Sequence, residues 1–173
     1  RVWQECRTVK RLGFRVIGIS PKGTRAGTHA ARDEVEGIPI YRYSLAHSGG
    51  GVAAYGREFV AAAVHSARLL RRVARETAVD VIHAGNPPDF LVLSALSLKR
   101  GGTRLIFDHH DISPELYSAR TGRRDAIYHA LRGLERVSFR AADVVISTNE
   151  SFRRIAIQRG GKRPEDVFVV RNG

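Results

Sequence analysis

Four consecutive ionisable residues, Asp108 to Asp111 (DHHD), form the first candidate site in this sequence. They follow the apolar run Leu105 to Phe107, which is typical of a buried strand. Ser113, Pro114 and Glu115 come next and predict a helix start, with Ser113 as N-cap. The pattern is therefore strand, ionisable loop, helix. In an open parallel α/β sheet, such loops lie at the carboxyl ends of strands, where ligands bind.

The adjacent histidines His109 and His110 could in principle hold a metal ion or contact a substrate. Neighbouring residues in an extended segment point in opposite directions, which argues against one ion held by both rings. The sequence contains no CxxC or HExxH spacing and no G-x-S-x-G nucleophile elbow. We therefore expect no metal site, and we interpret one histidine as a hydrogen-bond donor to a sugar or phosphate oxygen.

Further polar side chains follow other predicted strands, and each has a structural explanation as well as a functional one. Asn86 and Glu150 lie on strand-end loops beside the DHHD segment. Asn149 is placed as a helix N-cap, and Asp89 as a first-turn charge. His83 falls inside a predicted strand, so we expect it to be a buried core histidine.

Apolar runs and helical periodicity alternate along the chain, which predicts α/β architecture. Strands are expected at residues 14–19, 37–43, 79–84, 105–107, 143–147 and 167–170, and helices at 1–12, 52–78, 90–99, 125–141 and 149–159. Residues 20–36 read as a polar loop, Pro39 places its strand near a sheet edge, and residues 48–51 predict a hinge. The expected fold is a Rossmann-like, doubly wound parallel sheet of about six strands. The loops after Ala84, Phe107 and Ser147 should share one edge.

The chain has 173 residues and a formal net charge of +12, which suits one basic globular domain. The densest basic run, Arg68 to Arg75, alternates with apolar residues at helical spacing. It fits a solvated helix face or an anionic membrane surface. Nucleic acid is not expected, because no nucleic-acid motif accompanies the charge. The single Cys6 and the lack of a long apolar run favour a cytoplasmic protein, peripheral on the membrane at most.

Six stretches together resemble the N-terminal domain of group 1 glycosyltransferases, the family 4 retaining enzymes of GT-B architecture. They are RVWQECRTVKRLGFRVIGISP, EGIPIYRY, DVIHAGNPPD, LIFDHHDISPELY, LERVSFRAADVVISTNESFRRIA and VFVVRNG. The resemblance implies a single Rossmann-like N-terminal domain over residues 1–173, with the first strand and the C-terminal donor domain absent. It implies that this half binds the acceptor, so we expect the isolated chain not to transfer sugar.

The resemblance also implies roles for particular residues. His110 matches the cleft histidine that contacts the transferred sugar, and Asp111 follows it in the same loop. His109, Asn86, Glu150 and Asn149 are carried over as substrate-binding residues. The implied partners are a nucleotide-sugar donor and a glycan or lipid-linked acceptor. No cofactor is implied, because the nucleotide-sugar is a substrate.

Two alternatives remain open at the level of the sequence. One is half of a GT-B sugar-nucleotide epimerase, which would need several carboxylates and histidines around the sugar. The other is a non-catalytic basic α/β module that docks on a membrane or nucleic acid. Salt-dependent binding to liposomes or duplex DNA would distinguish the second from an enzyme.

Overall fold

The computed structural model describes residues 2–23, 30–45, 51–99 and 101–171. The chain forms two compact units, Arg1–Val73 with Gly173, and Ala74–Asn172. Most of the predicted hinge, residues 48–50, and part of the predicted polar loop, residues 24–29, lie outside the described residues. Within the described part, no helix has the length and apolar character that crossing a bilayer requires.

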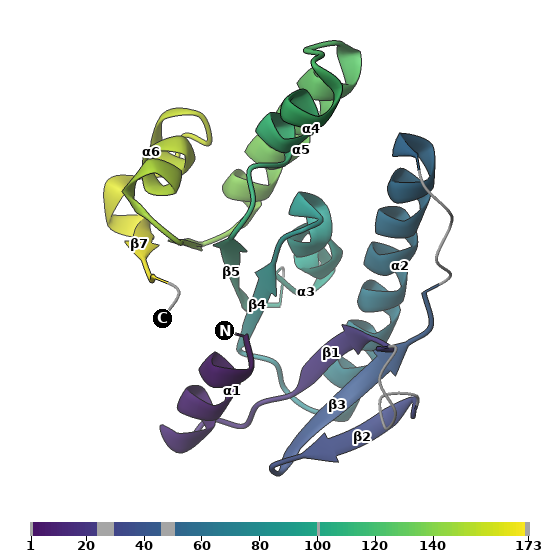
Figure 1. Ribbon diagram of the computed structural model, residues 1–173. Coiled ribbons are helices and arrows are strands. Elements are labelled where there is room, and N and C mark those ends of the chain that lie inside the picture. Colours follow the sequence, from purple (N-terminus) through teal and green to yellow (C-terminus); the bar gives the residue numbers. More distant parts are fainter. Residues whose placement is uncertain (1, 24–29, 46–50, 100, 172–173) are drawn as a thin grey trace. The chain divides into compact units, whose positions relative to one another are not determined.

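The first unit begins with helix α1, Val2–Arg11, and contains a small mixed sheet (Figure 1). Its strands are β1, Gly18–Pro21, β2, Arg32–Val35, and β3, Ile38–Tyr43. Strand β3 lies between the other two, parallel to β1 and antiparallel to β2. The expectation that Pro39 marks an edge strand is therefore wrong. Pro39 is opposite Glu34 of β2, but the pairing of β3 with β1 starts only at Ile40. At Pro39, β3 is therefore paired on one side only, as an edge strand is, and the missing backbone N–H is tolerated there.

Strand β2 lies in the segment that was predicted to be a polar loop. Its residues are mostly charged and alternate between exposed and half-buried positions, so they carry little apolar signal. A tight turn joins β2 to β3, and both of its residues have positive φ, 50° at Glu36 and 71° at Gly37. Two positive φ values are the requirement of a type I′ hairpin turn. The turn, rather than strand propensity, is what brings this charged segment into the sheet.

Helix α2, Val52–Glu76, confirms the long helix expected from periodicity. Leu70 and Val73 are buried, whereas Arg68, Arg71 and Arg75 are exposed. The helix is thus amphipathic over its second half, with the basic run on its outer face.

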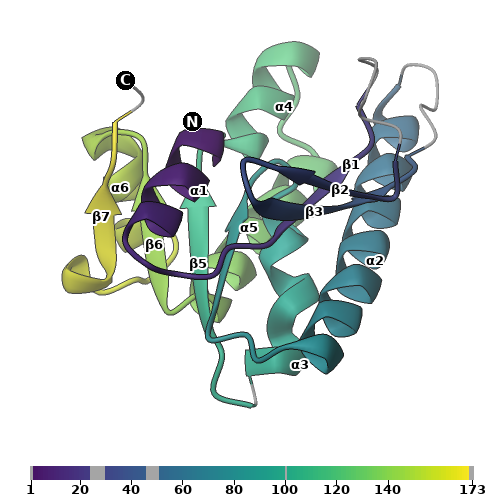
Figure 2. The same cartoon turned by 90° about the horizontal axis from the view of Figure 1, so that it is seen from below.

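The second unit is built on a parallel sheet whose order is β4-β5-β6-β7 (Figures 1 and 2). The strands are Val81–Gly85, Arg104–His109, Val144–Ser147 and Val167–Val169. All three pairings are parallel, so the loops after β4, β5 and β6 share one edge, as expected. The expectation of one larger sheet is wrong, because the described strands divide between this sheet and the small mixed sheet.

Helices cover this sheet and meet one another. They are α3, Leu96–Lys99, α4, Ser113–Thr121, α5, Ala126–Ala141, and α6, Glu150–Gln158, with 3-10 turns η1, Asp89–Ala95, and η2, Pro164–Asp166. Helix α5 packs on β5, η1 and α4. The predicted helix at 90–99 is a 3-10 helix over most of its length. The N-cap of α4 is Ile112 rather than Ser113, whose hydroxyl instead donates to Asp89.

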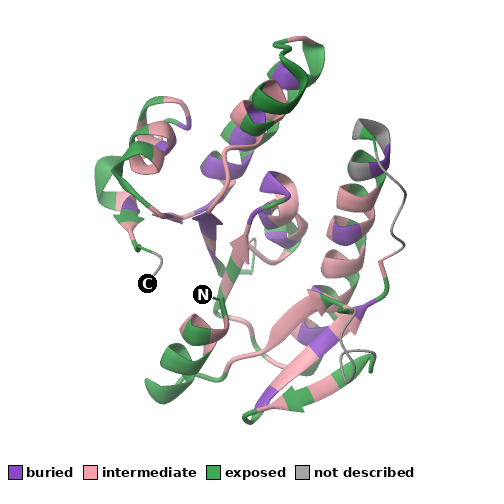
Figure 3. Ribbon diagram, in the orientation of Figure 1, coloured by how far each residue is buried: buried purple, intermediate pink, exposed green. Residues whose placement is uncertain are grey.

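The core of this unit centres on β5, whose residues Leu105, Phe107, Asp108 and His109 are all buried (Figure 3). Phe107 meets the buried Phe139 of α5 edge to face, with ring centroids 5.4 Å apart. At Gly160, an added Cβ would lie 2.5 Å from the Phe139 ring, so only glycine fits there. The core thus buries two ionisable side chains at the end of its central strand.

Candidate functional site

The candidate site lies at the carboxyl edge of the parallel sheet. The register pairs Gly85 of β4 with Asp108 of β5, and His109 of β5 with Ser147 of β6. The three strands therefore end at the same level, and the residues after them begin the loops that carry Asn86, His110 and Asn149. This is the edge at which open α/β sheets bind ligands.

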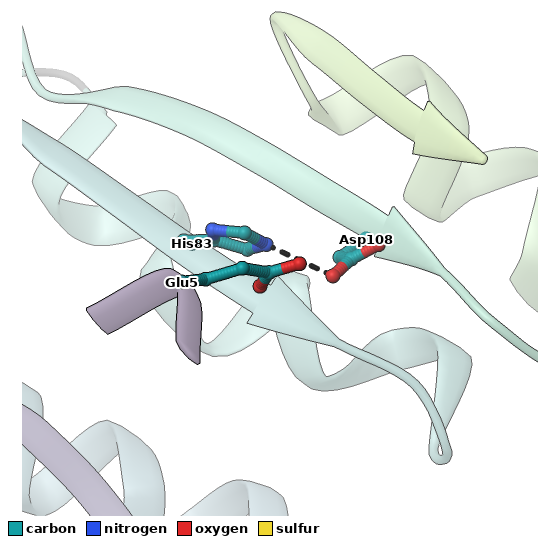
Figure 4. A group of neighbouring side chains, drawn as sticks. All are labelled: Glu5, His83 and Asp108. Carbon is teal, nitrogen blue, oxygen red and sulfur yellow. Dashed lines mark ion pairs between the residues drawn. The ribbon is translucent and has the colours of Figure 1, made fainter. Parts of the chain in front are cut away.

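Asp108 is the buried carboxylate of the site, and its side chain is 1% exposed. Its Oδ2 lies 2.6 Å from Nε2 of His110 and 3.2 Å from Nε2 of His83 (Figure 4 shows the His83 contact). Burial acts to raise the pKa of Asp108, but hydrogen bonding from His83 and His110 outweighs burial and holds the pKa below its usual value. Asp108 is therefore an ionised acceptor shared by two imidazoles.

Sequence reasoning placed Asp108 in the DHHD segment but not among the site residues. Side chains two apart on a strand point to the same face, so Asp108 and His110 could have been paired from spacing alone. The expectation that His83 is buried is wrong: its side chain is 35% exposed.

Asn86 fixes the backbone of the loop that carries His110. Its Oδ1 accepts hydrogen bonds from the backbone N–H of His110 at 2.6 Å and of Asp111 at 3.0 Å. Its Nδ2 donates to the carbonyl of Asp111 at 2.7 Å and to Oδ1 of Asp89 at 2.6 Å. The amide is buried, and these four bonds use its full hydrogen-bonding capacity. Asn86 thus holds the loop in place; its predicted contact with substrate stays a prediction.

Asp89 holds the side chain of Asn86 by a hydrogen bond. It is buried, and its Oδ1 accepts from Asn86 and, at 3.1 Å, from the Ser113 hydroxyl. Burial raises the pKa of this carboxyl, and the bonds from Asn86 and Ser113 only partly oppose that effect. The pair Asn86 and Asp89 joins the loops after β4 and β5 to the start of α4.

His109 points to the opposite side, as expected for a neighbour of His110 in a strand. It is 0% exposed and lies among the rings of Phe107, Phe139 and Phe152, with centroids 5.0 to 5.7 Å away. Burial and the positive charge of Arg159 lower the pKa of His109 to about 4. The ring is therefore neutral and internal. Its predicted role in substrate binding stays a prediction.

Arg159 joins three helices next to His109. From the end of α6, its guanidinium contacts Glu115 of α4, with Nη2 to Oε2 at 3.2 Å, and Glu135 of α5, with Nε to Oε2 at 2.6 Å. Glu135 is 0% exposed, and burial raises its pKa to about 7 despite the pairing with Arg159. This network is a structural support behind the site that sequence reasoning did not identify.

Asn149 and Glu150 have contacts local to α6. Asn149 is the N-cap, and its Oδ1 accepts from the backbone N–H of Phe152 at 3.0 Å, which confirms the cap. Glu150 is exposed in the first turn, 4.0 Å from Arg153. Asp111 is half-buried, with its backbone held by Asn86. The substrate contacts predicted for Asn149, Glu150 and Asp111 remain predictions.

The parallel four-stranded sheet of the second unit, with helices packed on it, is a Rossmann-like α/β fold. The family described as Glycosyltransferase Family 4 has a model that matches residues 1–173, so the chain belongs to that family. The chain therefore belongs with glycosyltransferases of GT-B architecture and represents their N-terminal domain, which implies a sugar donor and an acceptor. No curated protein matches it. The epimerase and the non-catalytic module are not favoured.

Proposed function

We propose that the chain is the acceptor-side half of a retaining glycosyltransferase. The enzyme moves a sugar from a nucleotide-sugar to a cell-surface glycan or a lipid-linked acceptor. The observation that carries this proposal is the placement of His110 at the strand edge, 2.6 Å from the buried Asp108. Its backbone N–H is fixed by Asn86 at 2.6 Å. Family membership supports the class of reaction.

The chemistry asks for fixed polar groups rather than a strong base. Retaining transfer passes through an oxocarbenium-like state while the leaving diphosphate gains negative charge, and preorganised dipoles stabilise such charge. His110 contacts the transferred sugar. In this proposal, Asp111, next in the loop, accepts a hydrogen bond from a sugar hydroxyl. The loop is held before substrate arrives, so little reorganisation is needed.

Asn86 and Asp89 hold the backbone of the loop, and Asp108 holds the ring of His110. Asn86 bonds both N–H groups of the His110–Asp111 segment, and Asp89 holds Asn86. The reaction as proposed uses no cofactor, because the nucleotide-sugar is itself a substrate.

The test is a transfer assay on the native, full-length protein with UDP-, GDP- and ADP-sugars and with lipid-linked and glycan acceptors. We expect nucleoside diphosphate release that depends on an acceptor, and a product with the anomeric configuration of the donor. Inverted product would remove the retaining mechanism. Release of an epimerised free sugar without transfer would support the epimerase, and absence of release across the panel would refute the proposal.

A further inference from the structure

Two imidazoles share one buried carboxylate oxygen at the carboxyl edge of the sheet. Nε2 of His110 lies 2.6 Å, and Nε2 of His83 3.2 Å, from Oδ2 of Asp108. The Asp108 side chain is 1% exposed, whereas those of His110 and His83 are 23% and 35% exposed. The carboxylate is thus inside, and the two rings lie between it and the surface.

The short separation decides which nitrogen of His110 carries its proton. An ionised carboxylate only accepts hydrogen bonds, so a nitrogen 2.6 Å from Oδ2 must carry hydrogen to avoid repulsion between lone pairs. The pKa of Asp108 is held below its usual value by hydrogen bonding from His83 and His110 against the effect of burial, so the carboxylate stays ionised at neutral pH. Nε2 of His110 is itself buried, which leaves Nδ1 as the nitrogen able to meet a ligand.

We propose that Asp108 is a positioning residue that fixes the Nε2–H tautomer of His110 and turns Nδ1 towards the bound sugar. This inference rests on the proposed function and adds the direction of the hydrogen bond. A neutral ring in this tautomer offers only an acceptor at Nδ1. It therefore receives a hydrogen bond from a sugar hydroxyl, and it does not serve a phosphate oxygen, which at neutral pH has no proton to donate. The expectation that the histidine donates is reversed for the neutral ring.

The first test is the tautomer itself, measured by nitrogen-15 NMR on the imidazoles of the unliganded native protein above the titration range of histidine. We expect His110 in the Nε2–H form, and a shift towards the Nδ1–H form in Asp108→Asn, whose amide is able to donate to Nε2. His129, exposed on α5, is the internal control and should not change. A wild-type His110 in the Nδ1–H form would overturn the proposal, whether or not the variant folds.

The second test is a double-mutant cycle on turnover with the donor that gives the highest rate in the transfer assay. Asp108→Asn should lower kcat/KM by roughly tenfold or more, on the precedent of other His–Asp pairs in enzymes. If Asp108 acts through His110, the same substitution should cost little in a His110→Ala background. Equal losses in both backgrounds would show a merely structural carboxylate and would overturn the proposal. If the wild-type protein transfers no sugar, the proposed function fails, while the NMR measurement still decides the tautomer.

Discussion

Asn86 and Asn149 are both amides on strand-end loops, and their contacts separate their roles. The Asn86 side chain is buried and makes four hydrogen bonds to three residues, and three of these bonds hold the backbone of His110 and Asp111. Asn149 is exposed and makes one capping bond to a helix N–H. The first amide therefore determines the shape of the site, and the second determines where α6 begins.

We predict that Asn86→Ala costs about 2–4 kcal/mol of unfolding free energy, because it leaves buried groups without partners. The matched substitution Asn149→Ala should cost only about 1 kcal/mol, the usual effect of losing an N-cap. Denaturant unfolding of both variants checks this. Equal costs would mean that the Asn86 bonds are replaced by water and that the amide does not organise the loop.

His109→Phe provides a second test at the scale of one residue. The imidazole nitrogens of His109 are buried without hydrogen-bond partners in the described part of the chain, and aromatic rings surround it. A phenylalanine should therefore fit, with a change in stability at pH 7 of less than about 1.5 kcal/mol. Turnover should be nearly unchanged if His109 only packs. A large loss of turnover with intact folding would restore His109 as a substrate-binding residue.

At the scale of elements, the spacing of apolar residues predicted most helices and the strands of the parallel sheet. The long helix α2, the capped helices α5 and α6 and the four parallel strands were predicted close to their observed bounds. Strand β2 was not, because its charged residues carry no apolar alternation and the hairpin turn alone places it. The strand of Pro39 was wrongly predicted to lie at a sheet edge. Proline requires only that its own position be unpaired on one side, and β3 meets this at Pro39 although the rest of the strand is central.

The sequence predicted which loops form the site, but not which residues support them. Sequence order locates the loops at one edge of a parallel sheet, so His110 and Asn86 could be named together. The sequence does not tell which polar group faces inward. Burial of Asp108, Asp89 and Glu135 depends on partners distant in sequence, such as the contact between Glu135 and Arg159. Those supporting residues are identified only by the three-dimensional structure.

Arg159 gives the prediction that belongs to the helices. Arg159→Gln leaves the carboxylate of Glu135 buried without its positive partner, so we expect a loss of about 3–5 kcal/mol at pH 8. The loss should be smaller at pH 5, because burial raises the pKa of Glu135 to about 7 and the neutral acid then needs no partner. Arg140→Gln, at an exposed position of α5, is the control and should change stability by no more than about 0.5 kcal/mol. A loss that does not vary with pH would contradict the assignment.

At the scale of the molecule, two buried groups act on stability with opposite dependence on pH. His109 has a pKa lowered from 6.5 to about 4, so the stability that its neutral form provides is complete above pH 6.5 and is lost as pH falls towards 4. Glu135 has a pKa raised from 4.5 to about 7, so its destabilising charge is absent below pH 4.5 and grows as pH rises to 7. Between these limits, the two effects largely cancel.

The variant His109→Phe should remove the loss of stability that protonation of His109 causes at low pH, and leave the effect of Glu135. Relative to the wild type, its stability should rise by roughly 2–3 kcal/mol between pH 7 and pH 4.5, the size expected for this change in pKa. Glu135 and Arg159 still face the position and are unchanged. Hydrogen exchange at the β5 amides reports the second unit separately from the first. A difference between variant and wild type that is constant across this range would mean that His109 does not titrate as described.

The net charge of +12 leads to a prediction about surfaces. Helix α2 exposes Arg68 and Arg71 and, elsewhere on the same helix, the apolar Val60. Each basic group near an anionic bilayer contributes about 1 kcal/mol. We expect co-sedimentation with vesicles rich in anionic lipid that weakens as salt rises. The double variant Arg68→Gln/Arg71→Gln should bind more weakly than Arg123→Gln/Arg124→Gln, which removes the same charge elsewhere. Equal binding of both variants, or equal binding to neutral vesicles, would leave the charge as a solubility feature.

The most direct test of the central claim is the effect of His110→Ala on turnover in the native, full-length protein. His129→Ala on α5 serves as the matched control. We predict that His110→Ala lowers turnover roughly 10²-fold or more, the scale for losing a preorganised group at the transition state. Folding should be intact, and His129→Ala should behave as the wild type. Near-normal turnover of His110→Ala with unchanged donor binding would show that His110 is a structural residue and that the site at the carboxyl edge of β5 has been misassigned.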